Sequence, residues 1–219
     1  MALYDFKNLI KRILSSVILI TISFYTIISG SYLFIFFISI VLLISLIEWH
    51  NMSFKKYYYF PGLFFLIISF YSAYLIRNDS TEYALFNFFL ILNICILTDI
   101  GGFFFGKFFK GPKITNISPN KTYSGAIGGI ILAVTGSLVY YDFIDFFIKK
   151  SDLTVSKIFI IVFVISFISQ LGDMIISFFK RLSNIKDTGK IIPGHGGILD
   201  RIDGMIFAFP LSYYLNILQ

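Results

Sequence analysis

The stretch KIFIIVFVISFISQLGDMIISFFKRLSNIKD, residues 157–187, passes from a long apolar run into a short and densely charged one. Its apolar part, residues 157–179, is long enough for the roughly 20 residues with which a helix crosses a bilayer. We expect a helix because, without water, each backbone amide must find its hydrogen-bond partner within the segment. The stretch therefore predicts a transmembrane helix that ends in a charged segment at the membrane surface.

Apolar stretches of similar length recur along the whole chain, separated by shorter polar segments. They lie near residues 13–29, 31–49, 58–76, 83–99, 126–148, 157–179 and 198–218. Ser29-Gly30-Ser31 leaves only a tight turn between the first two stretches, so these should form a helical hairpin. We predict an all-α, polytopic integral membrane protein with about seven transmembrane helices.

The composition agrees with a membrane protein. Hydrophobic residues make up 57% of the 219 residues and charged residues 14%, at a mean hydropathy of +0.84. Soluble domains have roughly 45–50% apolar and about 25% charged residues. The net charge of +6 does not indicate a nucleic-acid partner, because the cations flank the apolar stretches instead of forming one patch. The single Cys95 excludes an intrachain disulfide.

The distribution of Lys and Arg predicts the orientation in the membrane. With the N-terminus in the cytoplasm, 14 of the 18 cations fall in cytoplasmic segments. The four others are Arg77, Lys149, Lys150 and Lys157. Since cytoplasmic loops are enriched in Lys and Arg, this bias places residues 100–125 and 180–199 on the cytoplasmic side.

A polar stripe follows one face of the helix predicted at 157–179. Its members recur at steps of four and three residues and are Ser166, Gln170, Asp173, Ser177 and Lys180. Hydrogen bonding between helices would explain the Ser and Gln residues. A carboxylate within a span costs about 2.5–3.5 kcal/mol on insertion scales, which favours a functional role for Asp173.

Asp200 and Asp203 stand one helical turn apart at the start of the last apolar stretch. Magnesium takes one or two carboxylates and keeps several waters or substrate phosphates. The pair, with Asp187 in the preceding loop, therefore predicts a Mg²⁺ site, although an N-cap is the alternative role for Asp200. Arg201 would clamp a phosphate or pair with an acid.

The loop before these acids contains PGHGG, residues 193–197, which does not continue a helix. Gly196 and Gly197 would allow the backbone to approach an anion closely. We expect His195 to donate a hydrogen bond to a phosphate or to order the loop, with a proton-accepting role as the alternative. Phosphoryl-type transfer depends mainly on positioning and charge stabilisation, so a general base is not required.

This charged segment resembles the signature of the phosphatidate cytidylyltransferases, also called CDP-diacylglycerol synthases. The matching residues are Ser177-x-x-Lys180-Arg181, Lys186-Asp187, Pro193-x-His195-Gly196-Gly197 and Asp200-Arg201-x-Asp203, without a gap. The resemblance implies transfer of CMP from CTP to phosphatidic acid, with release of pyrophosphate and formation of CDP-diacylglycerol. It also implies a requirement for Mg²⁺.

A second segment is similar to the same family. Asp99 ends the fourth apolar stretch, and a Gly- and Phe-rich run leads to Ser118-Pro119-Asn120-Lys121-Thr122. The family has Lys in place of Asn120 and Glu in place of Ser124, so no acid role is assigned to this loop. Lys121 with the hydroxyls of Ser118 and Thr122 suits phosphate or nucleotide binding. Gly125 and Gly129 indicate a close helix–helix contact.

These observations and the resemblance define the predicted site. Residues 1–90 would be N-terminal transmembrane helices, and residues 91–219 a catalytic membrane region with two cytoplasmic loops, within one cytidylyltransferase domain. We assign catalysis to Asp173, Ser177, Lys180, Asp187, Asp200 and Asp203, with Asp187, Asp200 and Asp203 as Mg²⁺ ligands. We assign substrate binding to Ser118, Lys121, Thr122, Lys180, Arg181, Lys186, His195, Gly196, Gly197 and Arg201. The expected location is the bacterial inner membrane, and a homodimer is compatible with this arrangement.

Two other functions remain as alternatives. A CTP-dependent lipid kinase of the dolichol or phytol type would also have several spans, but it would produce a phosphorylated lipid and CDP. A small transporter with a charged gate is disfavoured, because the charges gather at one side of the membrane instead of following the spans.

The orientation can be tested with introduced cysteines. Cysteines placed at Ser183 and Asn120 should not react with an impermeant thiol reagent added outside intact cells, because both positions are predicted to be cytoplasmic. Labelling of either cysteine from outside would overturn the predicted topology.

Overall fold

The computed structural model consists of helices joined by short connections. It describes residues 2–81, 83–115, 118, 121–148, 155–191 and 196–215. The helices are α1 (Ala2–Ser29), α2 (Ser31–Ser53), α3 (Tyr59–Arg77), α4 (Ala84–Phe109), α5 (Tyr123–Ile148), α6 (Val155–Leu182), α7 (Leu199–Ile202) and α8 (Met205–Tyr214). No β-strand occurs in the described residues, which confirms the predicted all-α class.

Five of these helices are long and apolar enough to cross a membrane. They contain the segments Ser31–Ser53, Tyr59–Arg77, Ala84–Phe109, Tyr123–Asp142 and Ser156–Leu182. Two shorter apolar segments, Ser15–Ser29 and Met205–Tyr214, correspond to the first and last predicted spans. The last one differs from the prediction: instead of one helix over 198–218, the structure has the single turn of α7 and then the short helix α8.

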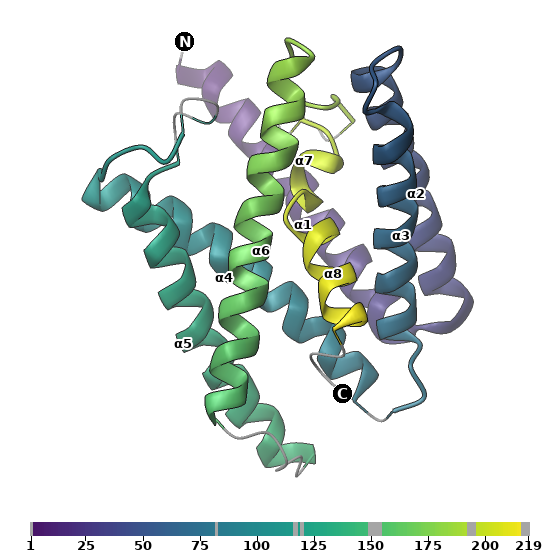
Figure 1. The fold of residues 1–219 in the computed structure, drawn as a ribbon, viewed down its shortest axis with the longest axis vertical. Coiled ribbons are helices and arrows are strands. Elements are labelled where there is room, and N and C mark those ends of the chain that lie inside the picture. The colour runs from purple at the N-terminus through teal and green to yellow at the C-terminus, as the bar shows by residue number, and fades with distance from the viewer. Residues whose placement is uncertain are drawn as a thin grey trace.

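The helices form a bundle whose connections lie at two ends (Figure 1). The start of α1, the α2–α3 connection and the α6–α7 segment lie at one end, at the top of Figure 1. The α1–α2 turn, the α3–α4 connection and the end of α8 lie at the other end. Helix α8 packs against α3, α4 and α6, so the C-terminal segment is in the middle of the bundle.

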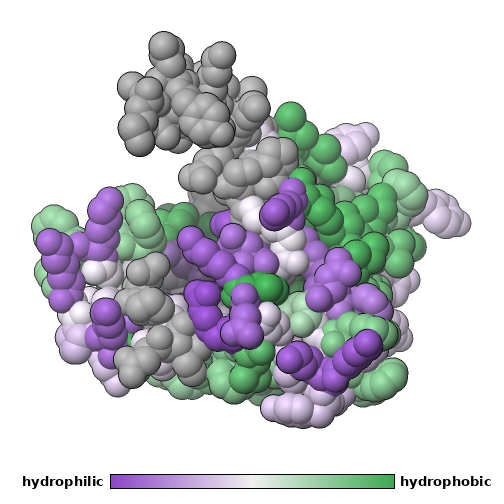
Figure 2. All heavy atoms as spheres, turned by 90° about the horizontal axis from the view of Figure 1, so that it is seen from above, coloured by the Kyte–Doolittle hydropathy of each residue, from purple (hydrophilic) through white to green (hydrophobic). Residues whose placement is uncertain are grey.

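The outer surface of the bundle is apolar, as expected for contact with lipid. Large hydrophobic side chains such as Ile20, Phe36 and Phe64 are each at least 66% exposed. An exposed apolar surface of this extent marks an interaction with a membrane or another protein. Hydrophilic residues instead gather over the end of the bundle seen from above in Figure 2. The structure thus has an apolar flank and a polar end.

The α1–α2 turn has the predicted hairpin form. Gly30 adopts φ = 60°, a left-handed conformation that glycine tolerates best. Arg77, at the end of α3, donates from Nε to the carbonyl oxygen of Ile27 at 2.7 Å and from its guanidinium to Ile28 at 3.2 Å. These bonds satisfy carbonyl groups at the end of α1 that have no partner within the helix.

Helices α4 and α5 contact each other through glycines. A Cβ atom on Gly101 would lie 2.8 Å from the Gly128 oxygen and the Gly129 Cα, and one on Gly129 would lie 2.7 Å from the Thr98 oxygen. The expected contact at Gly125 and Gly129 is therefore confirmed. The glycines also correct the predicted boundary of the cytoplasmic loop. Helix α4 continues beyond Asp99 to Phe109, because Gly101 packs against α5 inside a regular helix.

Substitution of Gly101 tests this contact. In Gly101→Ala the new methyl group meets backbone atoms that a side-chain rotation cannot move, so α4 and α5 must separate. Overpacking of this kind costs about 1–3 kcal/mol of stability. We expect a lower midpoint of thermal unfolding in detergent for Gly101→Ala.

The neighbouring Gly102→Ala is the matched control. Its Cβ atom would lie 3.8 Å from the nearest other residue, an ordinary van der Waals distance. The midpoint of Gly102→Ala should stay close to that of the unchanged protein. Equal midpoints for the two variants would contradict a backbone contact at Gly101.

Candidate active site

A polar cavity of about 440 Å³ lies among α4, α5, α6 and α7. Five carboxylates and three cations line it, together with hydroxyl, amide and apolar groups. The charged residues are Asp99, Lys121, Asp173, Lys180, Asp187, Asp200, Arg201 and Asp203. Ser118 and Thr122 also line it, so the structure brings together nine of the predicted site residues: Ser118, Lys121, Thr122, Asp173, Lys180, Asp187, Asp200, Arg201 and Asp203.

The polar stripe on α6 forms one wall of this cavity and also joins α6 to its neighbours. Near the middle of the bundle, Ser166 accepts a hydrogen bond from Thr98 at 2.7 Å. One turn further, the Gln170 amide donates to the carbonyl oxygen of Ala126 at 3.1 Å. Ser166 therefore packs helices together, whereas Gln170, Asp173 and Lys180 of the stripe line the cavity.

Asp173 is the acceptor for two groups. The Lys121 ammonium lies 2.5 Å from its carboxylate, and Ser177 donates to it at 3.3 Å. The ion pair joins α6 to the segment that precedes α5. Ser177 is therefore buried beside the cavity and orients a residue that lines it.

The side chain of Asp200 is only 6% exposed and accepts three different donors. Lys180 donates to Oδ1 at 2.9 Å, and the backbone amides of Thr188 and Gly197 donate to Oδ2 at 2.9 and 3.0 Å. Burial alone would raise the pKa of Asp200, but the Lys180 bond and charge and the two amides hold its pKa below the usual value. Asp200 is therefore a charged carboxylate that orders the loop before α7.

Asp203 is the most enclosed acid of the cavity, with 9% of its surface exposed. Burial, followed by the nearby carboxylate of Asp173, raises its pKa well above the usual range. Within the described residues no three acidic, His or Cys side chains are grouped closely enough to hold a metal by themselves. Adjacent carboxylates of this kind would suit a divalent cation that takes one or two protein ligands and further oxygens from a substrate.

The two ends of the segment between α4 and α5 pair with each other in an antiparallel bridge, beside Lys121. The Ile114 amide donates to the Lys121 carbonyl, and the Tyr123 amide donates to the Pro112 carbonyl, both at 3.0 Å. Ser124, which stands where the resemblance has Glu, accepts a hydrogen bond from the Gly111 amide at 3.2 Å. At the position where the family has Glu, this chain therefore has a hydroxyl group that links the end of α4 to the start of α5.

Other predicted residues lie outside the lining of this cavity. Arg181 and Lys186 are exposed, and the Gly197 amide already donates to Asp200. Gly196 adopts φ = 88° beside Asp187 and Asp200, so it forms the turn that precedes α7. His195 lies outside the described residues.

Two acids at the site were not assigned a role from the sequence. Asp99 lines the cavity because α4 continues past it, so it is a carboxylate within a helix, like Asp173. Glu48 lies on α2 and is only 2% exposed. One feature of the sequence does distinguish Glu48: it is the one acid in α2, near the end of an apolar stretch.

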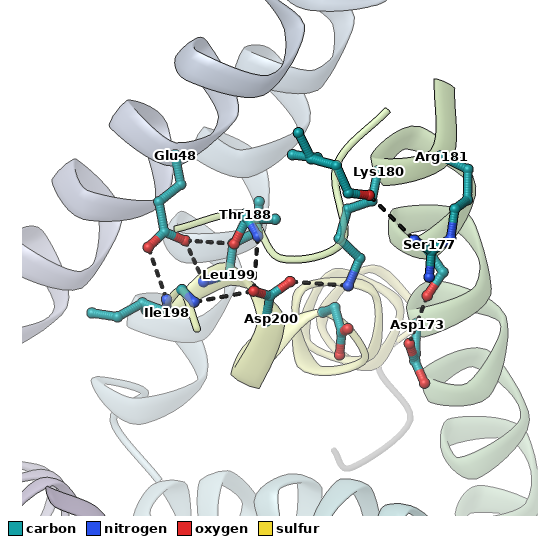
Figure 3. Close-up of polar contacts among 12 residues, drawn as sticks. Glu48, Asp173, Ser177, Lys180, Arg181, Thr188, Ile198, Leu199 and Asp200 are labelled. Atoms are coloured by element: carbon teal, nitrogen blue, oxygen red, sulfur yellow. Dashed lines mark hydrogen bonds and ion pairs between the residues drawn. The ribbon is translucent and has the colours of Figure 1, made fainter. Parts of the chain in front are cut away.

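Glu48 holds the loop that leads into α7 (Figure 3). Its Oε2 accepts hydrogen bonds from the Thr188 hydroxyl at 2.9 Å and the Leu199 amide at 2.8 Å, and its Oε1 accepts one from the Ile198 amide at 2.9 Å. Figure 3 shows Glu48 and Asp200 on opposite sides of this loop. Two carboxylates from distant parts of the chain therefore order the same segment.

The fold and the cavity define a polytopic helical membrane protein with a site of mixed charge at one end of its bundle. The chain belongs to the cytidylyltransferase family, whose profile, described as "Cytidylyltransferase family", matches residues 59–218.

Individual relatives are similar over nearly the whole chain. A protein of Rickettsia felis named phosphatidate cytidylyltransferase is 34% identical over 220 residues, which cover 98% of this chain and 95% of that protein. The protein of the same name from Rickettsia typhi is 36% identical, covering 97% and 94%. That from Staphylococcus haemolyticus is 40% identical over 152 residues, covering 69% of this chain and 54% of that protein.

Proposed function

We propose that this chain transfers CMP from CTP to phosphatidic acid, giving CDP-diacylglycerol and pyrophosphate. The observation that carries this proposal is the similarity to proteins named phosphatidate cytidylyltransferase over 98% of the chain. The position of the cavity supports it. A reaction between a soluble nucleotide and a membrane lipid needs charged groups beside an apolar surface, and the polar end and apolar flank meet this need.

The reaction joins two anions, so its first requirement is positive charge. A phosphatidate oxygen would attack the α-phosphorus of CTP, and the bond from that phosphorus to the β-phosphate oxygen would break as pyrophosphate leaves. Lys121 and Arg201 line the cavity and would neutralise phosphate oxygens there. The attacking phosphate is already anionic at neutral pH, so positioning and charge stabilisation account for catalysis without a general base.

We propose Asp203 and Asp173 as the carboxylates that bind Mg²⁺ together with substrate phosphates. The ion would supply charge neutralisation at the phosphate groups. The crowding of Asp203 by Asp173 supports this choice, since a cation between them would relieve it. Asp187 also lines the cavity and remains a candidate ligand, while the three hydrogen bonds to Asp200 favour its role in ordering the loop.

The apolar helices and the bacterial relatives support an integral membrane protein. We extend this to the bacterial inner membrane with the cavity toward the cytoplasm, because most Lys and Arg residues fall in the segments at that end. The homodimer stays a prediction from the sequence.

The reaction is tested with purified protein in detergent. Incubation with CTP labelled at the α-phosphate, phosphatidic acid and Mg²⁺ should transfer label to the lipid fraction. A parallel sample with CTP labelled at the γ-phosphate should release labelled pyrophosphate. Label from the γ-phosphate in the lipid would instead identify a CTP-dependent lipid kinase. Absence of label from the lipid in both samples, at every Mg²⁺ concentration, would refute both activities.

Arg201→Lys tests how the phosphates are held. A guanidinium can donate to two phosphate oxygens at once, whereas an ammonium is a point charge. We expect kcat/KM for CTP to fall at least about 10-fold, which corresponds to about 1.4 kcal/mol of transition-state stabilisation. Lys55→Gln, at an exposed position outside the cavity, is the control and should retain activity. Equal activity of Arg201→Lys and the unchanged protein across a CTP titration would show that only the charge matters.

A further inference from the structure

Glu48 is a buried carboxylate that is held by hydrogen bonds from neutral donors. Among the described residues neither ion pair includes it, and its 2% exposure leaves almost no contact with solvent. A charge in such a place costs free energy that an apolar residue of similar size would not. The three hydrogen bonds that it accepts offset this cost, and all three donors lie in the loop between α6 and α7 or at the first residue of α7.

The loop is shaped to receive this carboxylate. A Cβ atom on Gly197 would lie 2.5 Å from Oε2 of Glu48, and one on Gly189 would lie 2.5 Å from Oε1. Both distances are too short for a side chain. Glycine at these two positions therefore allows the loop backbone to approach Glu48 closely enough for its amides to donate.

The same loop determines where the cavity residues of α7 lie. Leu199, whose amide donates to Glu48, begins α7 and directly precedes Asp200 and Arg201. Thr188 donates from its hydroxyl to Glu48 and from its amide to Asp200. A shift of the loop away from Glu48 would therefore move Asp200, Arg201 and Asp203 relative to α6.

We propose that Glu48 is a positioning residue for CMP transfer: from α2, it holds Thr188, Ile198 and Leu199 so that Arg201 and Asp203 face the substrate cavity. This proposal rests on the proposed function. It assigns a role to a helix that lies before the part of the chain matched by the family profile, which starts at residue 59. Glu48 is not among the residues that line the cavity, so it would act through the residues that it holds.

Glu48→Gln tests the proposal with little change in shape. The side chain of Gln has one accepting oxygen and an NH2 group that only donates, so at least one of the three donors would face another donor. A misplacement of about 1 Å in an active site can cost about 100-fold in rate. We expect kcat to fall by at least about 10-fold, toward this limit. KM for CTP should rise at the same time, since Arg201, which would hold phosphate oxygens of the nucleotide, moves with α7.

Thr188→Val removes one of the donors and provides a second, independent variant. It should lower kcat less than Glu48→Gln does, and the double variant should be no slower than Glu48→Gln alone. Such non-additivity is expected when two residues act through one contact. If Glu48→Gln does not fold, Thr188→Val and Gly197→Ala still test the proposal, because each disturbs the same contact from the loop side.

Hydrogen exchange of the loop separates this role from activity and from general stability. The amides of Ile198 and Leu199 should exchange faster in Glu48→Gln and Thr188→Val, while amides in α4 and α5 keep their rates. Ser45→Ala is the matched control: Ser45 is fully buried one turn earlier on α2, and its hydroxyl donates within that helix. It should change neither kcat nor the exchange of the loop.

The proposal is wrong if kcat of Glu48→Gln and Thr188→Val stays within twofold of the unchanged protein, or if Ser45→Ala loses as much. It is also wrong if the loss of kcat merely follows a lower fraction of folded protein. Failure of the unchanged protein to form labelled lipid would instead refute the proposed function, and the exchange measurement would still report on the contact.

Discussion

The structure depends on how the negative charge of its carboxylates is balanced by cations and hydrogen-bond donors where a polar site lies beside a bilayer. Removing a charge from water is costly unless opposite charges or several donors surround it. Asp173 lies beside Lys121, Asp200 accepts Lys180 and two amides, and Glu48 accepts two amides and a hydroxyl. Apart from the bond from the Gly197 amide to Asp200, these contacts join residues that are at least 12 positions apart, so the compensation of charge also determines how the helices and loops assemble around the cavity.

Much of this arrangement follows from patterns that are local in the sequence. The apolar stretches predicted the helical class, and the steps of four and three placed Asp173 and Lys180 on the α6 face that carries the cavity wall. Lys121 and Arg201 were also predicted as site residues, and both line the cavity. Local periodicity is sufficient here because the spacing of residues along one helix determines which side chains share a face.

Features that depend on contacts between distant segments were not predictable in this way. Glycines usually indicate a break in a helix, yet Gly101 lies within α4 because α5 supplies a backbone surface for it. Asp99 therefore lines the cavity from within α4, whereas the sequence had placed it at the end of a span. The role of Glu48 was equally hidden, since its donors lie about 140 residues further along the chain. A single acid in an apolar stretch shows that a partner is needed but does not identify it.

The lining of the cavity has a consequence for the order in which small molecules enter. Three cationic side chains and five carboxylates give it a formal charge of −2 when all five acids, including Asp203, are ionised. Free CTP, a polyanion, would meet net repulsion there, whereas one divalent cation would bring the formal charge of the lining to zero. The nucleotide is therefore expected to arrive as its metal complex or after the metal. In that event the ion pair between Lys121 and Asp173 must break, because Asp173 would bind the metal and Lys121 a phosphate of the nucleotide. The binding of metal and the binding of nucleotide would therefore favour each other.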